Sequence, residues 1–241
     1  METLFISDLH LHEERPDITE GFFGFLKDHA YKADSLYILG DFFEAWVGDD
    51  LNSPLIQATK KALKELTTHN TTLFIMHGNR DFLIGDEFCR ECNATLINDP
   101  TLITLEGRSA LLMHGDTLCT DDTDYLRFRG MVRNTSWQTE FLAKPLPERL
   151  TIAKQLRDQS KESATHKDKY IMDTNQQEVE RILGNYNVDL LIHGHTHRPA
   201  RHIINTHQVD AERIVLGDWD KLGWYLRVDE EGMALTQFPI K

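Results

Sequence analysis

Five short clusters of aspartate, histidine and asparagine are spread over the first 200 residues of the chain. They read Asp8-Leu9-His10, Gly40-Asp41, Gly78-Asn79-Arg80-Asp81, His114-Gly115-Asp116 and Gly194-His195-Thr196-His197. Carboxylate and amide oxygens and imidazole nitrogens are ligands that divalent cations accept in proteins. Two carboxylates such as Asp8 and Asp41 would repel each other in a half-buried crevice unless cations neutralised them. One such residue alone is more often structural, but the five clusters together predict a metal site.

Each cluster follows a short apolar run that is typical of a buried strand. The runs are Leu4-Phe5-Ile6, Leu36-Tyr37-Ile38-Leu39, Leu73-Phe74-Ile75-Met76, Ala110-Leu111-Leu112-Met113 and Leu190-Leu191-Ile192. Between the early runs, apolar residues recur at three- and four-residue steps, which predicts an α/β fold with helices packed on a sheet. Ligands bind at the carboxyl ends of strands in such folds, so the clusters should converge there. On an extended strand the side chains of Asp8 and His10 would share one face, and His195 and His197 would repeat that arrangement.

Two later parts of the chain depart from this alternation. Residues 122–177 hold helical patterns that are broken near Pro145 and Pro147, because proline cannot continue a helix interior. Trp137, Phe141 and Leu142 are expected on one face of these helices. We interpret the segment as a helical insertion within a single domain of residues 1–241. Four apolar runs between Ile203 and Thr236 are close together, and they predict an antiparallel set that completes the sheet or forms a second one.

The composition limits the classes of partner. The net charge of −13 argues against bulk, non-specific binding to nucleic acid. Residues 125–170 carry ten basic against five acidic side chains, which indicates either a local anionic partner or a solvated helix surface. Three cysteines, Cys89, Cys92 and Cys119, fit a reducing compartment without disulfides. The acidic N-terminus is unlike a signal peptide, and no apolar run approaches the ~18 residues of a membrane span, so we expect a cytosolic chain.

In this order, the five motifs resemble those of the calcineurin-like metallophosphoesterase family, over roughly residues 1–200. The resemblance implies a β-sandwich flanked by helices in four layers, and two divalent metal ions bridged by one aspartate and a water. Carried onto this chain, the first metal would be bound by Asp8, His10, Asp41 and His197. The second would be bound by Asp41, Asn79, His114 and His195, which makes Asp41 the bridge.

Arg80 departs from the usual pattern of that family. Most phosphomonoesterases and phosphodiesterases of the family carry histidine after the asparagine, where it helps the leaving group depart. An alkoxide leaving group benefits from such an acid. A phosphate leaving group has a pKa near 6 and can depart unprotonated. Arginine does not give up its proton but binds phosphate bidentately, so Arg80 favours a phosphoanhydride substrate.

A narrower resemblance covers nearly the whole chain. Residues 5–11, 37–46, 77–83, 113–122 and 191–199 are similar to the branch of the family that acts in lipid A biosynthesis. This resemblance implies hydrolysis of the pyrophosphate bond of a UDP-linked diacyl sugar, which gives UMP and the acylated sugar phosphate. It also implies Mn²⁺ as the metal, peripheral association with the cytoplasmic face of the inner membrane, and no nucleic acid or obligate protein partner.

The same resemblance assigns roles to individual residues. Asn79, Arg80 and His195 would take part in catalysis, and the same three would contact the substrate together with Asp122, Ser160 and Lys167. The insertion over residues 122–177 would act as a lid whose apolar interior takes the acyl chains. Ala164 stands where the family often has asparagine, which leaves one polar contact open. Two other functions also stay open, a phosphodiesterase acting on a cyclic nucleotide or nucleic acid and a non-catalytic scaffold of the same fold.

Overall fold

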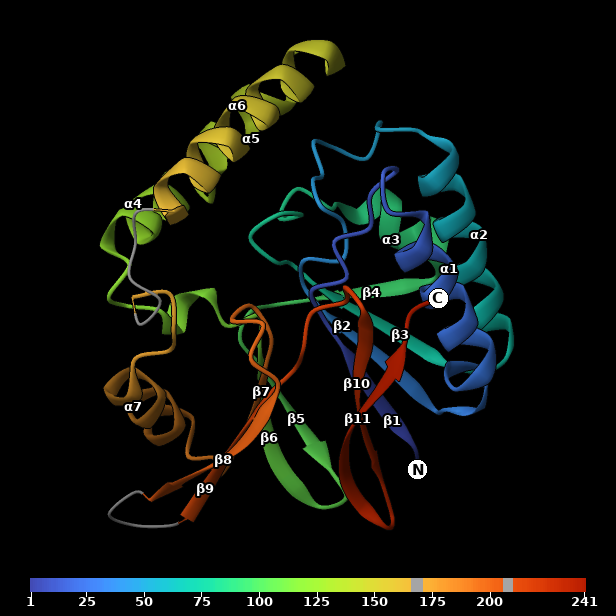
Figure 1. Cartoon of the computed structure of the whole chain (residues 1–241), viewed down its shortest axis with the longest axis vertical. Coiled ribbons are helices and arrows are strands. Elements are labelled where there is room, and N and C mark those ends of the chain that lie inside the picture. Colours follow the sequence, from blue (N-terminus) through green and yellow to red (C-terminus); the bar gives the residue numbers. More distant parts are fainter. Residues whose placement is uncertain (166–170, 206–209) are drawn as a thin grey trace.

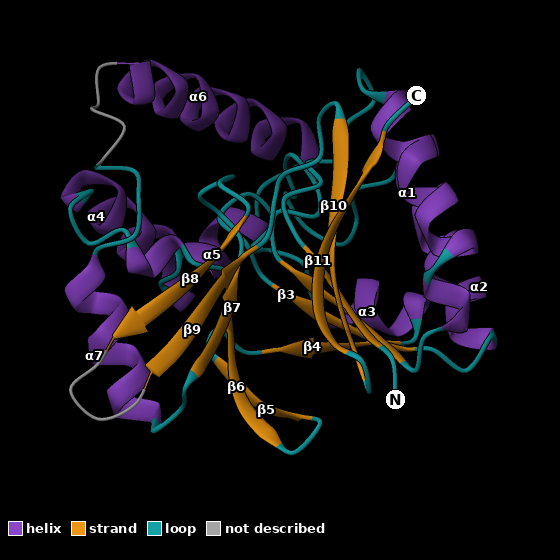
Figure 2. Cartoon of the chain, turned by 60° about the horizontal axis from the view of Figure 1, so that its bottom comes forward, coloured by secondary structure: helices purple, strands orange, loops and turns teal. Residues whose placement is uncertain are grey.

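The computed structural model describes residues 1–165, 171–205 and 210–241, and the side chains of residues 161–165 and 205 lie outside that description. Two mixed β-sheets face each other, with helices on their outer sides (Figures 1 and 2). The predicted α/β sandwich flanked by helices is therefore confirmed. Lys167 and the side chain of Ala164, both named in the sequence analysis, fall outside the described part.

The first sheet has six strands in the order β11-β10-β1-β2-β3-β4. They are β1 (Thr3–Ile6), β2 (Ser35–Leu39), β3 (Thr72–Met76), β4 (Ala94–Ile97), β10 (Leu222–Asp229) and β11 (Gly232–Pro239). Strands β1 to β4 are parallel, whereas β10 is antiparallel to β1. Because β1, β2 and β3 run in one direction, the chain leaves all three at the same edge, where the first three clusters follow.

The second sheet has five strands in the order β5-β6-β7-β9-β8. They are β5 (Thr101–Leu105), β6 (Arg108–Met113), β7 (Leu190–His193), β8 (Ala200–Asn205) and β9 (Asp210–Val215). Strands β6, β7 and β9 are parallel, and β5 and β8 are antiparallel edges. The C-terminal runs thus serve both sheets, since β10 and β11 complete the first and β8 and β9 belong to the second.

Three apolar cores hold the layers together. Phe5, Leu112 and Ile192 belong to the core between the two sheets. The outer face of the first sheet is covered by α1 (Pro16–Asp28), α2 (Pro54–Thr68) and α3 (Asp86–Cys92). On the second sheet, α7 (Gln176–Tyr186) buries Val179 and Leu183. Short 3₁₀ turns occur at η1 (Ala30–Lys32) and η2 (Asp116–Leu118). All three cysteines are buried and free.

The predicted insertion contains α4 (Thr123–Val132), α5 (Thr135–Leu142) and α6 (Leu146–Thr165), which project beyond the sheets in Figure 1. Asp122 caps α4, where its carboxylate accepts a hydrogen bond of 3.1 Å from Tyr125 N. Pro145 separates α5 from α6, and Pro147 lies in the first turn of α6, where its missing N–H breaks no helical hydrogen bond. Gln176 and Gln177 already belong to α7. No helix within the described ranges is long and apolar enough to cross a membrane.

Candidate metal centre

The seven predicted ligands lie in loops that follow five parallel strands drawn from both sheets. Asp8 and His10 follow β1, Asp41 follows β2, Asn79 follows β3, His114 follows β6, and His195 and His197 follow β7. The carboxyl ends of these strands meet at one end of the sandwich. Side chains more than 180 residues apart in sequence are thereby brought into contact, as His10 and His197 are.

Five of these residues have a left-handed backbone conformation, with φ of 56° at Asp8, 49° at His10, 49° at Asp41, 68° at His195 and 54° at His197. The prediction that Asp8 and His10 share a face of an extended strand is therefore wrong, because β1 ends at Ile6 and the chain then turns. The same prediction for His195 and His197 is also wrong, because β7 ends at His193. Main-chain hydrogen bonds impose the turn, since Asp8 N donates to Gly40 O at 3.1 Å and His10 N donates to Asp41 O at 2.9 Å. Backbone conformations of this kind cluster at functional sites.

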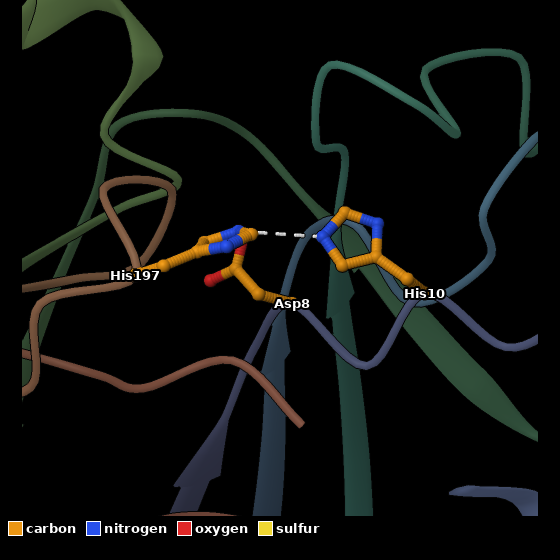
Figure 3. Close-up of side chains that lie close together, drawn as sticks. All are labelled: Asp8, His10 and His197. Atoms are coloured by element: carbon orange, nitrogen blue, oxygen red, sulfur yellow. Dashed lines mark hydrogen bonds and ion pairs between the residues drawn. The ribbon is translucent and has the colours of Figure 1, made fainter. Parts of the chain in front are cut away.

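Asp8, His10 and His197 form the first group of donors, which Figure 3 shows. The Nε2 atoms of His10 and His197 lie 3.4 Å apart and face each other. Asp8 Oδ1 is 3.4 Å from His197 Nε2. One ligand atom from each of the three residues lies within 4.8 Å of the others, which is compact enough for a single cation.

Asn79, His114 and His195 form the second group. Asn79 Oδ1 lies 2.9 Å from both His114 Nε2 and His195 Nδ1. Asp41 lies between the two groups, with Oδ2 at 3.9 Å from His10 Nε2 and Oδ1 at 3.7 Å from His114 Nε2. A carboxylate in this position reaches toward both groups of donors at once.

Two glycines allow the loops to approach closely. A Cβ at Gly78 would lie 2.1 Å from Asp41 N, and one at Gly194 would lie 2.3 Å from Asp8 Oδ2. Such separations are too short for any side chain, so only glycine fits at these two positions. The glycines that the sequence places in the clusters therefore let the main chain touch the carboxylates of the site.

The electrostatic setting attracts positive charge. Burial alone would lower the pKa of His114, but the neighbouring Asp41 and Asp116 carboxylates raise it to about 9. The pKa of His10 is also raised against burial, by Glu44 and Asp41. Burial raises the pKa of Asp41, and repulsion from the nearby carboxylates of Asp81 and Asp8 raises it further. A proton taken up here occupies the place that a bound cation would fill.

The donor set fits a divalent metal ion. Asp8 is fully buried, and its Oδ1 makes no well-formed hydrogen bond among the described residues, although His197 Nε2 lies 3.4 Å away. A buried carboxylate oxygen without a well-formed hydrogen bond is costly unless a cation meets it. Its other oxygen is satisfied, because Oδ2 accepts hydrogen bonds from Ser7 Oγ at 2.6 Å and His195 N at 2.9 Å. Oxygen and imidazole donors together suit Mn²⁺, Zn²⁺ and related ions.

Sequence reasoning missed the groups that orient the imidazoles. Glu44 Oε2 lies 3.0 Å from His10 Nδ1, and Asp218 Oδ2 lies 3.4 Å from His197 Nδ1. The Leu39 carbonyl accepts a hydrogen bond of 2.9 Å from His114 Nδ1. In each case Nδ1 has an oxygen neighbour and Nε2 faces the site. Histidines that bind a metal are usually held in this way, with the other ring nitrogen hydrogen-bonded to a carboxylate or carbonyl oxygen. Position after a strand identifies the candidate ligands, but no sequence pattern marks these supporting carboxylates.

Two cavities adjoin the metal centre and share Asn79 and Arg80 in their walls. The first lies beneath α4, α5 and α6 and is lined mainly by apolar side chains, among them Phe82, Phe128, Trp137, Phe141 and Leu156. The second is lined by the predicted substrate residues Asp122, Ser160 and His195. Leu142 was expected beside Phe141, but its side chain is 42% exposed, because one further residue turns it by about 100° around the helix.

Arg80 stands where the two cavities meet the donors. Its main-chain N–H donates to Asp41 Oδ1 at 2.7 Å. Its side chain lines both cavities, and Nε is buried without a hydrogen-bond partner among the described residues. A guanidinium placed this way can bind an anion that enters from either cavity.

Comparisons with known proteins agree with this geometry. Residues 1–199 match the model of the calcineurin-like phosphoesterases. A curated relative from Cellvibrio japonicus (strain Ueda107), named UDP-2,3-diacylglucosamine hydrolase, is 52% identical over 240 residues and covers 100% of both chains. A relative of the same name from Azotobacter vinelandii (strain DJ) is 50% identical, again over 100% of both chains. Among solved structures, an archaeal phosphodiesterase is similar in fold, with a TM-score of 0.51, 14% identity and 99% coverage of both chains.

Proposed function

Because this chain belongs to the calcineurin-like phosphoesterase family, we propose that it hydrolyses the pyrophosphate bond of UDP-2,3-diacylglucosamine in lipid A biosynthesis. The products are UMP and 2,3-diacylglucosamine 1-phosphate. The observation that carries this proposal is the identity of about half of all residues, over the full length, to relatives that bear the name of this hydrolase. The apolar lining of the cavity beside the metal donors supports the proposal that it takes the diacyl part of the substrate.

Two divalent ions, which we propose to be Mn²⁺, would be held by the two groups of donors. Asp8, His10, Asp41 and His197 would hold one, and Asp41, Asn79, His114 and His195 would hold the other. When bound, such a pair neutralises phosphate charge and lowers the pKa of a water so that it can attack phosphorus. The protein supplies the fixed positions, since Asp41 is aimed at both groups by its hydrogen bond from Arg80 N.

Arg80 would bind the phosphate that leaves with the sugar. Its planar guanidinium offers two parallel donors to one phosphate, and no proton needs to be given to a leaving group whose pKa is near 6. Asn79 and His195 would contact the same diphosphate. Asp122 and Ser160 line the second cavity and would contact the sugar. Lys167 remains a predicted contact of the substrate that lies outside the described residues.

We propose that the insertion is a lid over the lipid part of the substrate. Trp137 and Phe141 stack with ring centroids 5.0 Å apart and present an apolar wall to the cavity. Met131, Leu142 and Leu150 of the insertion are each more than 40% exposed. These apolar side chains, in a segment with an excess of basic residues, support peripheral contact with the anionic cytoplasmic surface of the inner membrane.

A substrate panel tests the function. The purified chain with Mn²⁺ is incubated with UDP-2,3-diacylglucosamine, its deacylated analogue, a cyclic nucleotide and an aryl phosphodiester. We expect rapid release of UMP from the first compound and a steep loss of kcat/KM without the acyl chains, since burial is worth up to about 0.8 kcal/mol per CH₂. Equal kcat/KM for both UDP sugars would refute the lid, and faster cleavage of the diester would refute the diphosphatase.

Two neighbouring residues provide a matched pair for the lid. Phe141 is 4% exposed and lines the cavity, whereas Leu142 does not line it. Phe141→Ala should raise KM for the diacylated substrate and leave that for the deacylated analogue unchanged. Leu142→Ala should change neither value. If both variants behaved alike, the cavity would not be the site of the acyl chains.

A further inference from the structure

Glu44 joins the first metal-binding group to the lid. We propose that the contact from Arg157 through Glu44 to His10 makes Glu44 a positioning residue that couples the seating of α6 to the metal affinity of the first site. Arg157 Nη2 of α6 makes an ion pair with Glu44 Oε1, and the other oxygen, Oε2, lies 3.0 Å from His10 Nδ1. One carboxylate thus touches the lid with one oxygen and a predicted ligand with the other.

Main-chain hydrogen bonds fix Glu44 beside His10. Leu11 N donates to Phe42 O at 2.9 Å, and Glu44 N donates to Leu11 O at 3.2 Å. These bonds lace the loop after β1 to the loop after β2, so the backbones of Glu44 and His10 cannot move apart independently. The remaining freedom lies in the Glu44 side chain, whose Oε1 is held by the ion pair with Arg157.

The position of Arg157 depends on how α6 sits. The base of α6 is anchored by Arg149, which is 3% exposed and donates from Nη1 to Val47 O at 2.5 Å and to Asp50 Oδ1 at 2.8 Å. Arg157 lies two turns further along the helix, beyond this anchor. Its guanidinium is half-buried, and its Nε has no hydrogen-bond partner among the described residues. The ion pair with Glu44 thus connects this part of α6 to His10 in the metal centre.

Asp218 provides the contrast that identifies the role of Glu44. It faces His197 Nδ1 as Glu44 faces His10 Nδ1, at 3.4 Å. Its ion pair with His197 belongs to the loop before β10 and involves no residue of the insertion. Both carboxylates orient an imidazole, but among the described residues only Glu44 of the two is joined to the lid. Removal of a second partner of this kind typically weakens metal binding about 10–100-fold.

The test measures Mn²⁺ binding to the metal-free chain by titration calorimetry, without substrate. Glu44→Gln and Asp218→Asn should each weaken binding about tenfold or more. Arg157→Gln should also weaken it in the wild-type background, and it should have no further effect in the Glu44→Gln background. In the Asp218→Asn background it should weaken binding as in wild type. Lys154→Gln, which removes a cation from the same helix one turn away, is the control and should leave the affinity unchanged.

Coupling is reciprocal, so Mn²⁺ must in turn affect the helix. Saturating Mn²⁺ should slow amide hydrogen exchange over residues 150–160 in the wild type and in Asp218→Asn. It should leave that exchange unchanged in Arg157→Gln and Glu44→Gln. An unchanged or higher Mn²⁺ affinity in Arg157→Gln would overturn the proposal, as would exchange that ignores Mn²⁺ in the wild type. The inference rests on the proposed metal ligands and lid, but a wrong substrate assignment would leave these binding results untouched.

Discussion

Gly78→Ala should damage the metal centre although glycine itself supplies no ligand atom. The added Cβ would lie 2.1 Å from Asp41 N and 2.2 Å from Asp41 Oδ1, whereas ordinary contact begins near 3.4 Å. The loops after β2 and β3 must therefore separate by more than 1 Å. A misplacement of about 1 Å at a reacting centre can lower kcat about 100-fold. Overpacking of this kind also costs about 1–3 kcal/mol of stability.

The assay combines three measurements on the purified variant, namely kcat for UDP-2,3-diacylglucosamine, bound Mn²⁺ by elemental analysis, and the free energy of unfolding in urea. Gly130→Ala is the matched control, because a Cβ there meets no atom within 4 Å and the residue lies inside α4. It should keep full activity and gain up to about 1 kcal/mol from helix propensity. Near wild-type kcat and metal content in Gly78→Ala would refute the inference that close approach of these loops positions Asp41.

Three further predictions concern single side chains. Asp41→Ala should reduce the metal content of both sites and His10→Ala mainly that of one, by elemental analysis of protein purified without chelator; normal content in Asp41→Ala would exclude the bridging role. Arg80→Ala should lower kcat about 10²–10³-fold with metal content unchanged, and Arg80→Lys should recover little because a point charge does not reproduce the planar fork; fast turnover by both would make Arg80 structural. The hydrogen bond from Arg149 lowers the pKa of the Asp50 carboxyl in the folded chain. The stability that this interaction adds is therefore present above the ordinary aspartate pKa of about 4, and it is lost as the pH falls through the lowered pKa of the folded state. The difference in the free energy of unfolding between wild type and Asp50→Asn should therefore shrink from pH 7 to pH 3, and a larger difference at pH 3 would contradict this sign.

Sequence patterns predicted the strands that carry the chemistry, because those strands are buried on both faces. The runs over β1, β2, β3, β6 and β7 are almost continuously apolar, and the structure confirms all five. Strands β4 and β5 were missed, since their residues alternate between exposed and half-buried and their composition is less apolar. The split of the C-terminal strands between two sheets was also left open, because pairing partners depend on tertiary contacts.

The convergence of the candidate ligands at one edge of the fold could be predicted from the sequence, but their local geometry could not. Residue type and position after a strand are enough to identify Asp41 or His114 as a candidate ligand. The left-handed backbone at Asp8 and His10 carries no mark in the sequence, because hydrogen bonds to a distant loop impose it. No sequence pattern marks Glu44 as a partner of His10 either. It meets His10 only after two loops, 34 positions apart, are hydrogen-bonded side by side.

The backbone strain of the ligand loops sets a limit on how this enzyme can acquire heat resistance. Each of the five left-handed donors costs about 1–2 kcal/mol relative to relaxed backbone, and a typical domain is stable by only about 5–15 kcal/mol. The strain is thus comparable to the whole margin of the fold. Glycine would relieve this strain but has no side chain to bind a metal ion. Substitution by glycine at these positions would therefore remove the ligand atom together with the strain. More thermostable variants must therefore gain their stability from substitutions in the helices and sheets, while the ligand loops keep their strained backbone.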